Sequence, residues 1–244
     1  MPDKRSHRGP HPNDAQLFAS EEWPRLRLAV SDLSWLLDRG YAAGSAIKLV
    51  GDRFSLEQRQ RIAVSRCTCS NEARDRRQRT RLQLARLNSQ PLLIDGFNVL
   101  TSIEAALAGG VILHARDGCF RDMASVHGTW RRVEETVRAV EMVGQLLAEH
   151  GIDRTVWYLD RPVSNSGRLK TILRKTAEHH SWSWDVELVP NPDRNLSLSA
   201  QPVATADSGI LDVCRCWVNL ARAVIEDRIP HANIVRFGEI TTAS

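Results

Sequence analysis

The sequence predicts an α/β protein in which a doubly wound, mostly parallel, five-stranded sheet is preceded by a small helical domain. Three observations lead to this prediction. Segments with strand and helix patterns alternate along the second part of the chain, which is typical of a parallel sheet with helices on both faces. The first part holds only helical patterns and is rich in arginine. Finally, three of the expected strands stop at an aspartate.

The charge of the chain is distributed unevenly, which supports a division into parts. Residues 1–90 hold 17 Lys and Arg against 10 Asp and Glu, whereas residues 91–244 hold 16 against 19. We expect a flexible tail in residues 1–16, a basic helical domain in 17–89 and the α/β domain in 90–244. A basic module beside an acidic one suggests a polyanionic partner for the first and clustered carboxylates in the second.

The composition indicates a globular protein in the cytoplasm. The hydrophobic fraction is 42%, and no apolar run approaches the roughly 18–20 residues that a membrane span needs. The first residues lack the apolar core of a signal peptide. The five cysteines are expected to be free thiols, because their odd number argues against a disulfide framework. Their two Cys-x-Cys pairs keep a zinc site open, although the spacing fits it poorly.

Helices are expected in the first part at residues 21–39, 55–67 and 71–87, with turns between glycines over 40–54. Ten arginines lie between Arg53 and Arg86, opposed by three acidic residues. Because the guanidinium group pairs with phosphate in bidentate geometry, this arginine-rich face predicts binding of nucleic acid, most simply RNA. The expected contacts are Arg74, Arg77 and Arg81. The alternative is a solvated helix face that docks on the acidic half.

In the second part, strands and helices are expected in alternation. The strands are 92–94, 155–159, 186–189, 203–205 and 233–237, and the helices are 129–150, 167–181 and 208–229. The run from Pro91 to Leu100 is central: a short buried strand ends at Asp95, Gly96 permits a sharp turn, and Asn98 can orient Asp95 or a bound water.

Two further strands end at Asp160 and Asp207, so that three carboxylates, with Asp95, are expected at one edge of a parallel sheet. Clustered carboxylates repel one another and stay ionised when a cation lies among them. Hard oxygen ligands select Mg²⁺ or Mn²⁺, which can activate water and stabilise the leaving oxygen of a phosphodiester. We therefore predict that these aspartates, assisted by Asn98, form a metal-dependent catalytic site.

Other side chains are candidates for the same site. Asp212, one helical turn beyond Asp207, and Asp117 are expected as additional metal ligands, with Glu135 next and Asp122 behind it. For each of them, an ordinary surface charge or a helix-dipole partner is the competing interpretation. Arg168 and Lys170 follow Asp160 at the start of a helix, where they could reach a substrate phosphate.

The stretch Ile94-Asp95-Gly96-Phe97-Asn98-Val99-Leu100 resembles the opening strand of the NYN branch of PIN-like nucleases, whose typical motif is Asp-Gly-Tyr-Asn. The resemblance covers residues 91–240 and implies a Rossmann-like sheet with a carboxylate cluster that binds Mg²⁺ or Mn²⁺ to cleave RNA. It would make Asp95, Asp160 and Asp207 metal ligands, whereas the family's acidic residue on a helix has no clear counterpart beyond Glu135. The first part resembles the uncharacterised family 434 of domains of unknown function through residues 38–41 and 48–54.

The sequence therefore predicts a metal-dependent ribonuclease. An RNA-binding regulator with a degenerate site is the alternative, and a phosphatase or nucleotide hydrolase on the same sheet is a third interpretation. Against the third, the chain lacks a phosphate-binding Gly-x-x-x-x-Gly-Lys-Ser/Thr loop. The oligomeric state is left open, a homodimer included.

Overall fold

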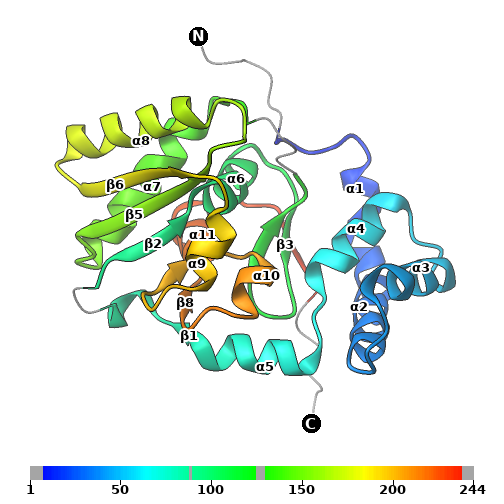
Figure 1. The fold of residues 1–244 in the computed structure, drawn as a ribbon. Helices are drawn as coiled ribbons and strands as arrows, with labels where there is room; N and C mark the ends of the chain where they lie inside the picture. Colours follow the sequence, from blue (N-terminus) through cyan, green and yellow to red (C-terminus); the bar gives the residue numbers. More distant parts are fainter. Residues whose placement is uncertain (1–7, 88–89, 125–129, 238–244) are drawn as a thin grey trace.

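The computed structural model describes residues 8–87, 90–124 and 130–237. Figure 1 shows an α/β half, at the left, beside a group of helices formed by the first part of the chain. The fold class expected from the sequence is confirmed: helices flank a parallel central sheet, and a helical region precedes it.

The central sheet has six strands, all paired in parallel, in the order β1-β8-β7-β2-β5-β6. Their bounds are β1 Arg81–Leu82, β2 Leu92–Asp95, β5 Arg154–Asp160, β6 Ser183–Val189, β7 Val203–Ala204 and β8 Trp217–Val218. The two central strands are short and fully buried, as expected of strands covered on both faces.

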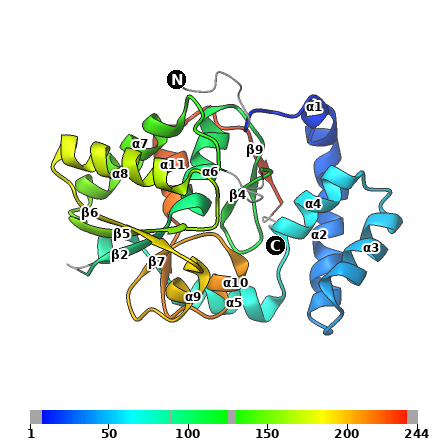
Figure 2. The ribbon, with the colours of Figure 1, turned by 45° about the horizontal axis from the view of Figure 1, so that its top comes forward.

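Helices cover both faces of this sheet, as Figure 2 shows. One face packs against α6 Gly96–Leu107, α7 Thr136–Glu149, α8 Ser166–His180 and α11 Leu220–Arg228, and the other against α9 Pro192–Ser197 and α10 Ser208–Leu211. Successive side chains of a strand point to opposite faces of the sheet. Leu92 and Ile94 of β2 therefore face the first layer of helices, whereas Leu93 faces the second. The sheet is therefore doubly wound.

Two expectations about the last part of the chain are wrong. The expected helix 208–229 is divided into α10 and α11 by β8, because Trp217 and Val218 are fully buried and pair with β7. The expected strand 233–237 forms, as β9 Ile234–Arg236, but it does not join the central sheet. A two-residue strand inside a helical pattern leaves almost no signal in the sequence, so tertiary pairing decides its conformation.

The strand β9 belongs to a second, three-stranded sheet with β3 Ile112–His114 and β4 Phe120–Asp122. The two faces of this small sheet pack into different hydrophobic cores. Ile112 and Phe120 pack against the helices of the α/β half, whereas Leu113 and Val235 pack against the helices of the first part. The two halves therefore share this small sheet as a common wall.

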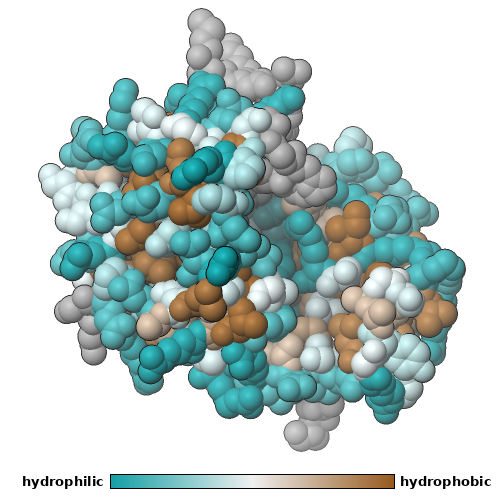
Figure 3. All heavy atoms as spheres, in the orientation of Figure 1, coloured by the Kyte–Doolittle hydropathy of each residue, from teal (hydrophilic) through white to brown (hydrophobic). Residues whose placement is uncertain are grey.

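The first part consists of α1 Asp14–Leu17, η1 Ser20–Glu22, α2 Trp23–Leu37, α3 Ala43–Arg53, α4 Gln58–Cys67 and α5 Asn71–Thr80. The segment expected as turns over 40–54 is mostly the helix α3. Helix α4 begins with a capping box between Glu57 and Gln60. Ser55, the first residue of the expected helix 55–67, instead lies in the preceding turn with a φ of 47°. Figure 3 shows apolar patches on this half and on the α/β half.

The third expected helix, 71–87, ends at Thr80, and the chain continues as β1 and then as η2 Leu84–Arg86. The expected flexible tail is also docked in its described portion. Arg8 forms an ion pair with the fully buried Glu104 of α6, and Asp14, which is 3% exposed, pairs with Arg59. Residues 1–7 lie outside the described chain.

Among the described residues, no helix has both the length and the apolar character to cross a membrane. All five cysteines are free thiols.

Candidate active site

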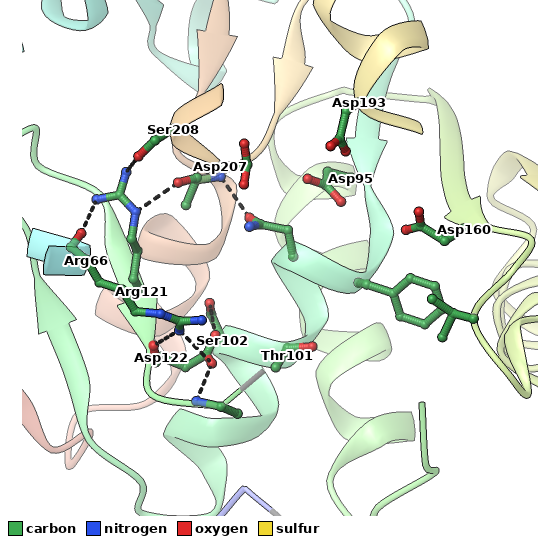
Figure 4. A pocket seen from close by; sticks show the side chains of 15 residues that line it. Arg66, Asp95, Thr101, Ser102, Arg121, Asp122, Asp160, Asp193, Asp207 and Ser208 are labelled. Atoms are coloured by element: carbon green, nitrogen blue, oxygen red, sulfur yellow. Dashed lines mark hydrogen bonds and ion pairs between the residues drawn. The ribbon is translucent and has the colours of Figure 1, made fainter. Parts of the chain in front are cut away.

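A cavity of about 490 Å³ opens at the carboxyl ends of the central strands. Figure 4 shows its walls, which are provided by the first turns of α6, by the ends of β5 and β7, by α9 and by β4. This is the place where open α/β sheets bind ligands. Fifteen residues line the cavity, and five of them are aspartates: Asp95, Asp122, Asp160, Asp193 and Asp207. The three aspartates expected from the strand ends thus face one cavity.

Asp95 is the most buried of the three expected aspartates, with 8% of its surface exposed. It ends β2, and α6 starts at the next residue. That abrupt change needs Gly96, since a Cβ atom there would lie 2.5 Å from Leu159 Cδ2 and 3.2 Å from the Tyr158 carbonyl oxygen. Burial raises the pKa of Asp95 to about 7, and the neighbouring charges of Asp207 and Asp193 act in the same direction.

A hydroxyl group links Asp95 to the end of β7. Thr205 Oγ1 donates to Asp95 Oδ2 at 2.8 Å and accepts the backbone N–H of Asp207 at 3.0 Å. Asn98 interacts with Asp95 through its backbone, since a hydrogen bond from the Asn98 backbone lowers the pKa of that carboxyl. The side chain of Asn98 binds elsewhere: its Oδ1 accepts the N–H of Ala206 at 2.8 Å. Asn98 therefore fixes the loop that presents Asp207.

Asp207 has two roles. One carboxylate oxygen, Oδ1, caps α10 by accepting the N–H groups of Gly209 at 2.8 Å and Ile210 at 3.2 Å. Asp207 is thus a helix-capping residue, which is the common role of an aspartate that directly precedes a helix. The residue nevertheless lines the cavity, and its second oxygen is not used by the cap.

Asp193 completes the group and was missed by the sequence analysis. It lies in the first turn of α9, four residues beyond the end of β6. Figure 4 shows Asp193 beside Asp95, with Asp160 and Asp207 on either side. The signal was present, because the Pro-Asn-Pro-Asp run after β6 places an acidic residue near the carboxyl end of a fourth strand. Asp193 does not directly follow an apolar strand pattern, however, and was therefore not among the aspartates expected at the strand ends.

The four carboxylates of Asp95, Asp160, Asp193 and Asp207 form no ion pair with any arginine or lysine in the described part of the chain. Burial raises the pKa of Asp160, and the charge of Asp193 acts in the same direction. Burial also raises the pKa of Asp193, together with the charge of Asp207. We call these four residues the aspartate cluster. Within the described ranges, no three His, Cys, Asp or Glu residues are already positioned to enclose a metal ion.

The opposite end of the cavity is basic and polar. Arg66 of α4 donates to the carbonyl oxygen of Asp122, and its Nη1 lies 3.7 Å from Asp122 Oδ1. Ser102 Oγ and the N–H of Ala124 also hold the Asp122 carboxylate, each at 2.8 Å. Asp122 is therefore a neutralised, structural carboxylate, whereas the guanidinium group of Arg66 is about one-third exposed beside the cavity.

Asp117 and Asp212, expected as additional metal ligands, do not line the cavity. Both are engaged by arginine. Asp117 is fully buried and paired with Arg77 and with Arg121, which lies 2.7 Å away, while Arg77 also lies 2.7 Å from Asp212. Burial alone would raise the pKa of Asp117, but the two guanidinium groups hold that pKa well below its usual range. Cations of the protein therefore already neutralise both carboxylates, and neither residue lies with the other aspartates expected as metal ligands.

Arg77, which is expected as a nucleic-acid contact, is 2% exposed inside this network. Arg74 pairs with Asp75, and Arg81 lies in β1 with its guanidinium group 5.9 Å from the ring of Trp217. Both remain accessible. Arg168 and Lys170 lie in the first turns of α8, and neither lines the cavity; Glu135 is the N-cap residue of α7 and also lies outside it.

Comparison with known proteins places both parts of the chain in families. The family described as "Protein of unknown function (DUF434)" matches residues 25–80, which confirms the resemblance expected for the first part. "Domain of unknown function (DUF5616)" matches residues 84–223. An uncharacterized protein of Methanocaldococcus jannaschii is 32% identical over 183 residues, covering 75% of this chain and 87% of that protein. No solved structure matches the chain. The chain therefore belongs to the DUF5616 family, with a DUF434 segment in front of it.

Proposed function

We propose that the protein is a divalent-metal-dependent ribonuclease whose aspartate cluster is the catalytic site. One observation carries the proposal: Asp95, Asp160, Asp193 and Asp207 come from four separate segments, line one cavity and lack an arginine partner among the described residues. Three other aspartates with buried side chains, Asp14, Asp117 and Asp122, each lie within ion-pair distance of an arginine.

The cluster has the chemistry of a site for Mg²⁺ or Mn²⁺. Its donors are carboxylate oxygens, which these hard cations prefer. Burial and the neighbouring charges of Asp207 and Asp193 raise the pKa of Asp95, and a bound cation would offset both effects. Asp95, Asp160, Asp193 and Asp207 would hold the ion, with Thr205 keeping Asp95 oriented. When bound, the metal would activate a water molecule and stabilise the leaving oxygen.

The remaining walls suit a phosphodiester substrate. The Arg66 guanidinium group is positioned to bind a phosphate oxygen at the end of the cavity away from the cluster, since only part of its hydrogen-bonding capacity is used by Asp122. Arg121 lines the same end but is committed to Asp117 and to the carbonyl oxygen of Ala206. We assign RNA as the substrate from the resemblance of residues 94–100 to the NYN branch of PIN-like nucleases, and from the accessible arginines Arg74 and Arg81.

Aspartate-to-asparagine variants test this proposal. Asp95→Asn and Asp160→Asn keep the side-chain volume but remove a metal-binding charge. We expect each to lower the Mn²⁺-dependent cleavage of single-stranded RNA by roughly 100-fold or more, a loss of about 3 kcal/mol of transition-state stabilisation. RNA affinity should remain within a few-fold. The matched control is Asp185→Asn, an exposed aspartate of β6 outside the cavity. Unchanged cleavage by pure, folded Asp95→Asn protein would refute the proposal.

A second candidate, an RNA-binding regulator without turnover, is favoured by one observation: the described chain holds no three metal-binding side chains already in place. In that case the wild-type protein would bind RNA with a steep dependence on salt concentration. It would show no cleavage in Mg²⁺ or Mn²⁺, and addition of Mn²⁺ would not raise its midpoint of thermal unfolding.

A further inference from the structure

A second cavity, of about 500 Å³, lies at the opposite edge of the central sheet. It is bounded by the end of α5, by β1 and η2, and by the residues that precede β2, β7 and β8. Figure 1 shows α5, β1 and β8 together at the lower edge of the molecule. We call this space the amino-edge cavity, because it adjoins the amino ends of the strands, whereas the aspartate cluster adjoins their carboxyl ends.

The charged residues that line the amino-edge cavity are all arginines: Arg79, Arg86 and Arg215. All three are exposed, and within the described chain none of them forms an ion pair or a side-chain hydrogen bond. Most arginines of the first part behave differently, since Arg59, Arg61 and Arg77 each pair with a carboxylate. Three neighbouring cations without an acidic neighbour in the lining attract an anion of high charge, and the planar guanidinium group fits the oxygens of a phosphate.

The rest of the lining is partly apolar, with Thr80 and Gln90 as uncharged polar residues. Leu82, Leu87, Ala200 and Pro202 provide a floor beside the arginines. A single small anion needs no such floor, whereas a nucleoside phosphate combines a charged group with a flat base that is stabilised by apolar contact. The volume also exceeds what one phosphate ion requires.

We propose that the amino-edge cavity binds a nucleoside phosphate, either as a free nucleotide or as part of an RNA strand. The arginines would bind the phosphate oxygens, and the base would rest on the apolar floor. The site does not depend on the metal chemistry of the aspartate cluster, because it is formed by different residues at the other edge of the sheet.

A cysteine in the lining can report whether a ligand occupies the amino-edge cavity. Cys216 lines it and is partly exposed, whereas the other four cysteines are buried. A neutral alkylating reagent such as iodoacetamide should therefore modify the full-length native protein first at Cys216, and mass spectrometry of its peptide gives the rate. A ligand that fills the cavity excludes the reagent. At a concentration ten times its Kd, it should slow the reaction roughly tenfold.

The experiment compares three probes at constant ionic strength: inorganic phosphate, adenosine 5′-monophosphate and a short oligouridylate. Protection by the nucleotide or the oligouridylate supports the proposal, and their relative strength identifies the free or the polymeric source. The double variant Arg79→Gln, Arg215→Gln should lose this protection. The matched control, Arg138→Gln on the exposed side of α7, should keep it.

Three results would overturn the proposal: no protection by any probe, protection by inorganic phosphate alone, or equal protection in the double variant. Titration calorimetry with the same probes gives the comparison independently of the thiol. The Asp95→Asn variant separates this site from the proposed nuclease, since it should lose cleavage and keep the protection of Cys216.

Discussion

Asp95 concentrates the chemistry of the site in one side chain. Its carboxylate is buried and lies near two further carboxylates, so its pKa is raised to about 7 from the ordinary value of 3.8, although the hydrogen bond from the Thr205 hydroxyl acts in the opposite direction. Between these two pH values the folded protein keeps a proton that the unfolded chain releases. The contribution of Asp95 to stability is therefore fully present below about pH 4 and is lost as the pH rises to about 7.

This linkage predicts a pH-dependent effect of Asp95→Asn. Each pH unit between the two pKa values corresponds to about 1.4 kcal/mol, so the wild type should lose on the order of a few kcal/mol relative to the variant between pH 4.5 and 8. Urea unfolding without divalent ions measures the difference, and Mn²⁺ should restore the stability of the wild type alone at pH 8. A constant difference between the two proteins across this range would contradict the raised pKa.

At the scale of elements, the buried network around Asp117 connects α5, β4 and α10. Arg77 reaches Asp117, Asp212 and the carbonyl oxygen of Ser208, and Arg121 reaches Asp117 and the carbonyl oxygens of Ala206 and Arg66. These contacts hold the loop of Asp207 against the first part of the chain. The network therefore supports the candidate site although it does not form the end of the cavity that holds the aspartate cluster.

Asp117→Asn should destabilise the protein by about 3–5 kcal/mol, because it leaves two buried guanidinium groups without their shared carboxylate. The control is Asp75→Asn, which removes a largely exposed pair with Arg74 and should cost less than about 1 kcal/mol. Urea unfolding of both variants at pH 7 checks the contrast. Equal losses would show that the buried network contributes no more than a surface pair.

The elements also show how much of the candidate site and of the fold could be predicted from the sequence. Asp95 and Asp160 could be predicted because each ends a strand with a clear apolar pattern, and Asp207 because it follows the strand β7 by three residues. Parallel strands bring such ends together. The partner of Asp117 could not be predicted, because nothing local reveals that Arg77, forty residues away, neutralises it. The strand β8 was missed because two residues carry too little pattern to compete with the helical sequence around them.

At the scale of the whole molecule, the second sheet joins the two halves. Val111, Leu113, Ala115, Val235 and Phe237 belong to the α/β half by sequence, yet they complete the core of α2, α3 and α4. The division at residue 89, drawn from charge, separates segments that share one apolar core. Charge patterns report the surface and therefore carry no information about such a shared interior.

A fragment of residues 84–244 should consequently fail to fold as a stable monomer. It lacks β1 and exposes the apolar face of the second sheet, so we expect aggregation and loss of a cooperative unfolding transition. Size-exclusion chromatography and thermal unfolding, with the full chain as control, check this. A monomeric fragment with a cooperative transition would show that the two halves are energetically independent.

The edge strand β1 occupies residues 81 and 82, which fall in the interval between the two family matches, 25–80 and 84–223. A protein that contained only one of these two families would expose to solvent either the strand β1 or its apolar neighbours. We therefore expect natural selection to retain the pair as one reading frame, or to supply a separate subunit that covers the bare surface.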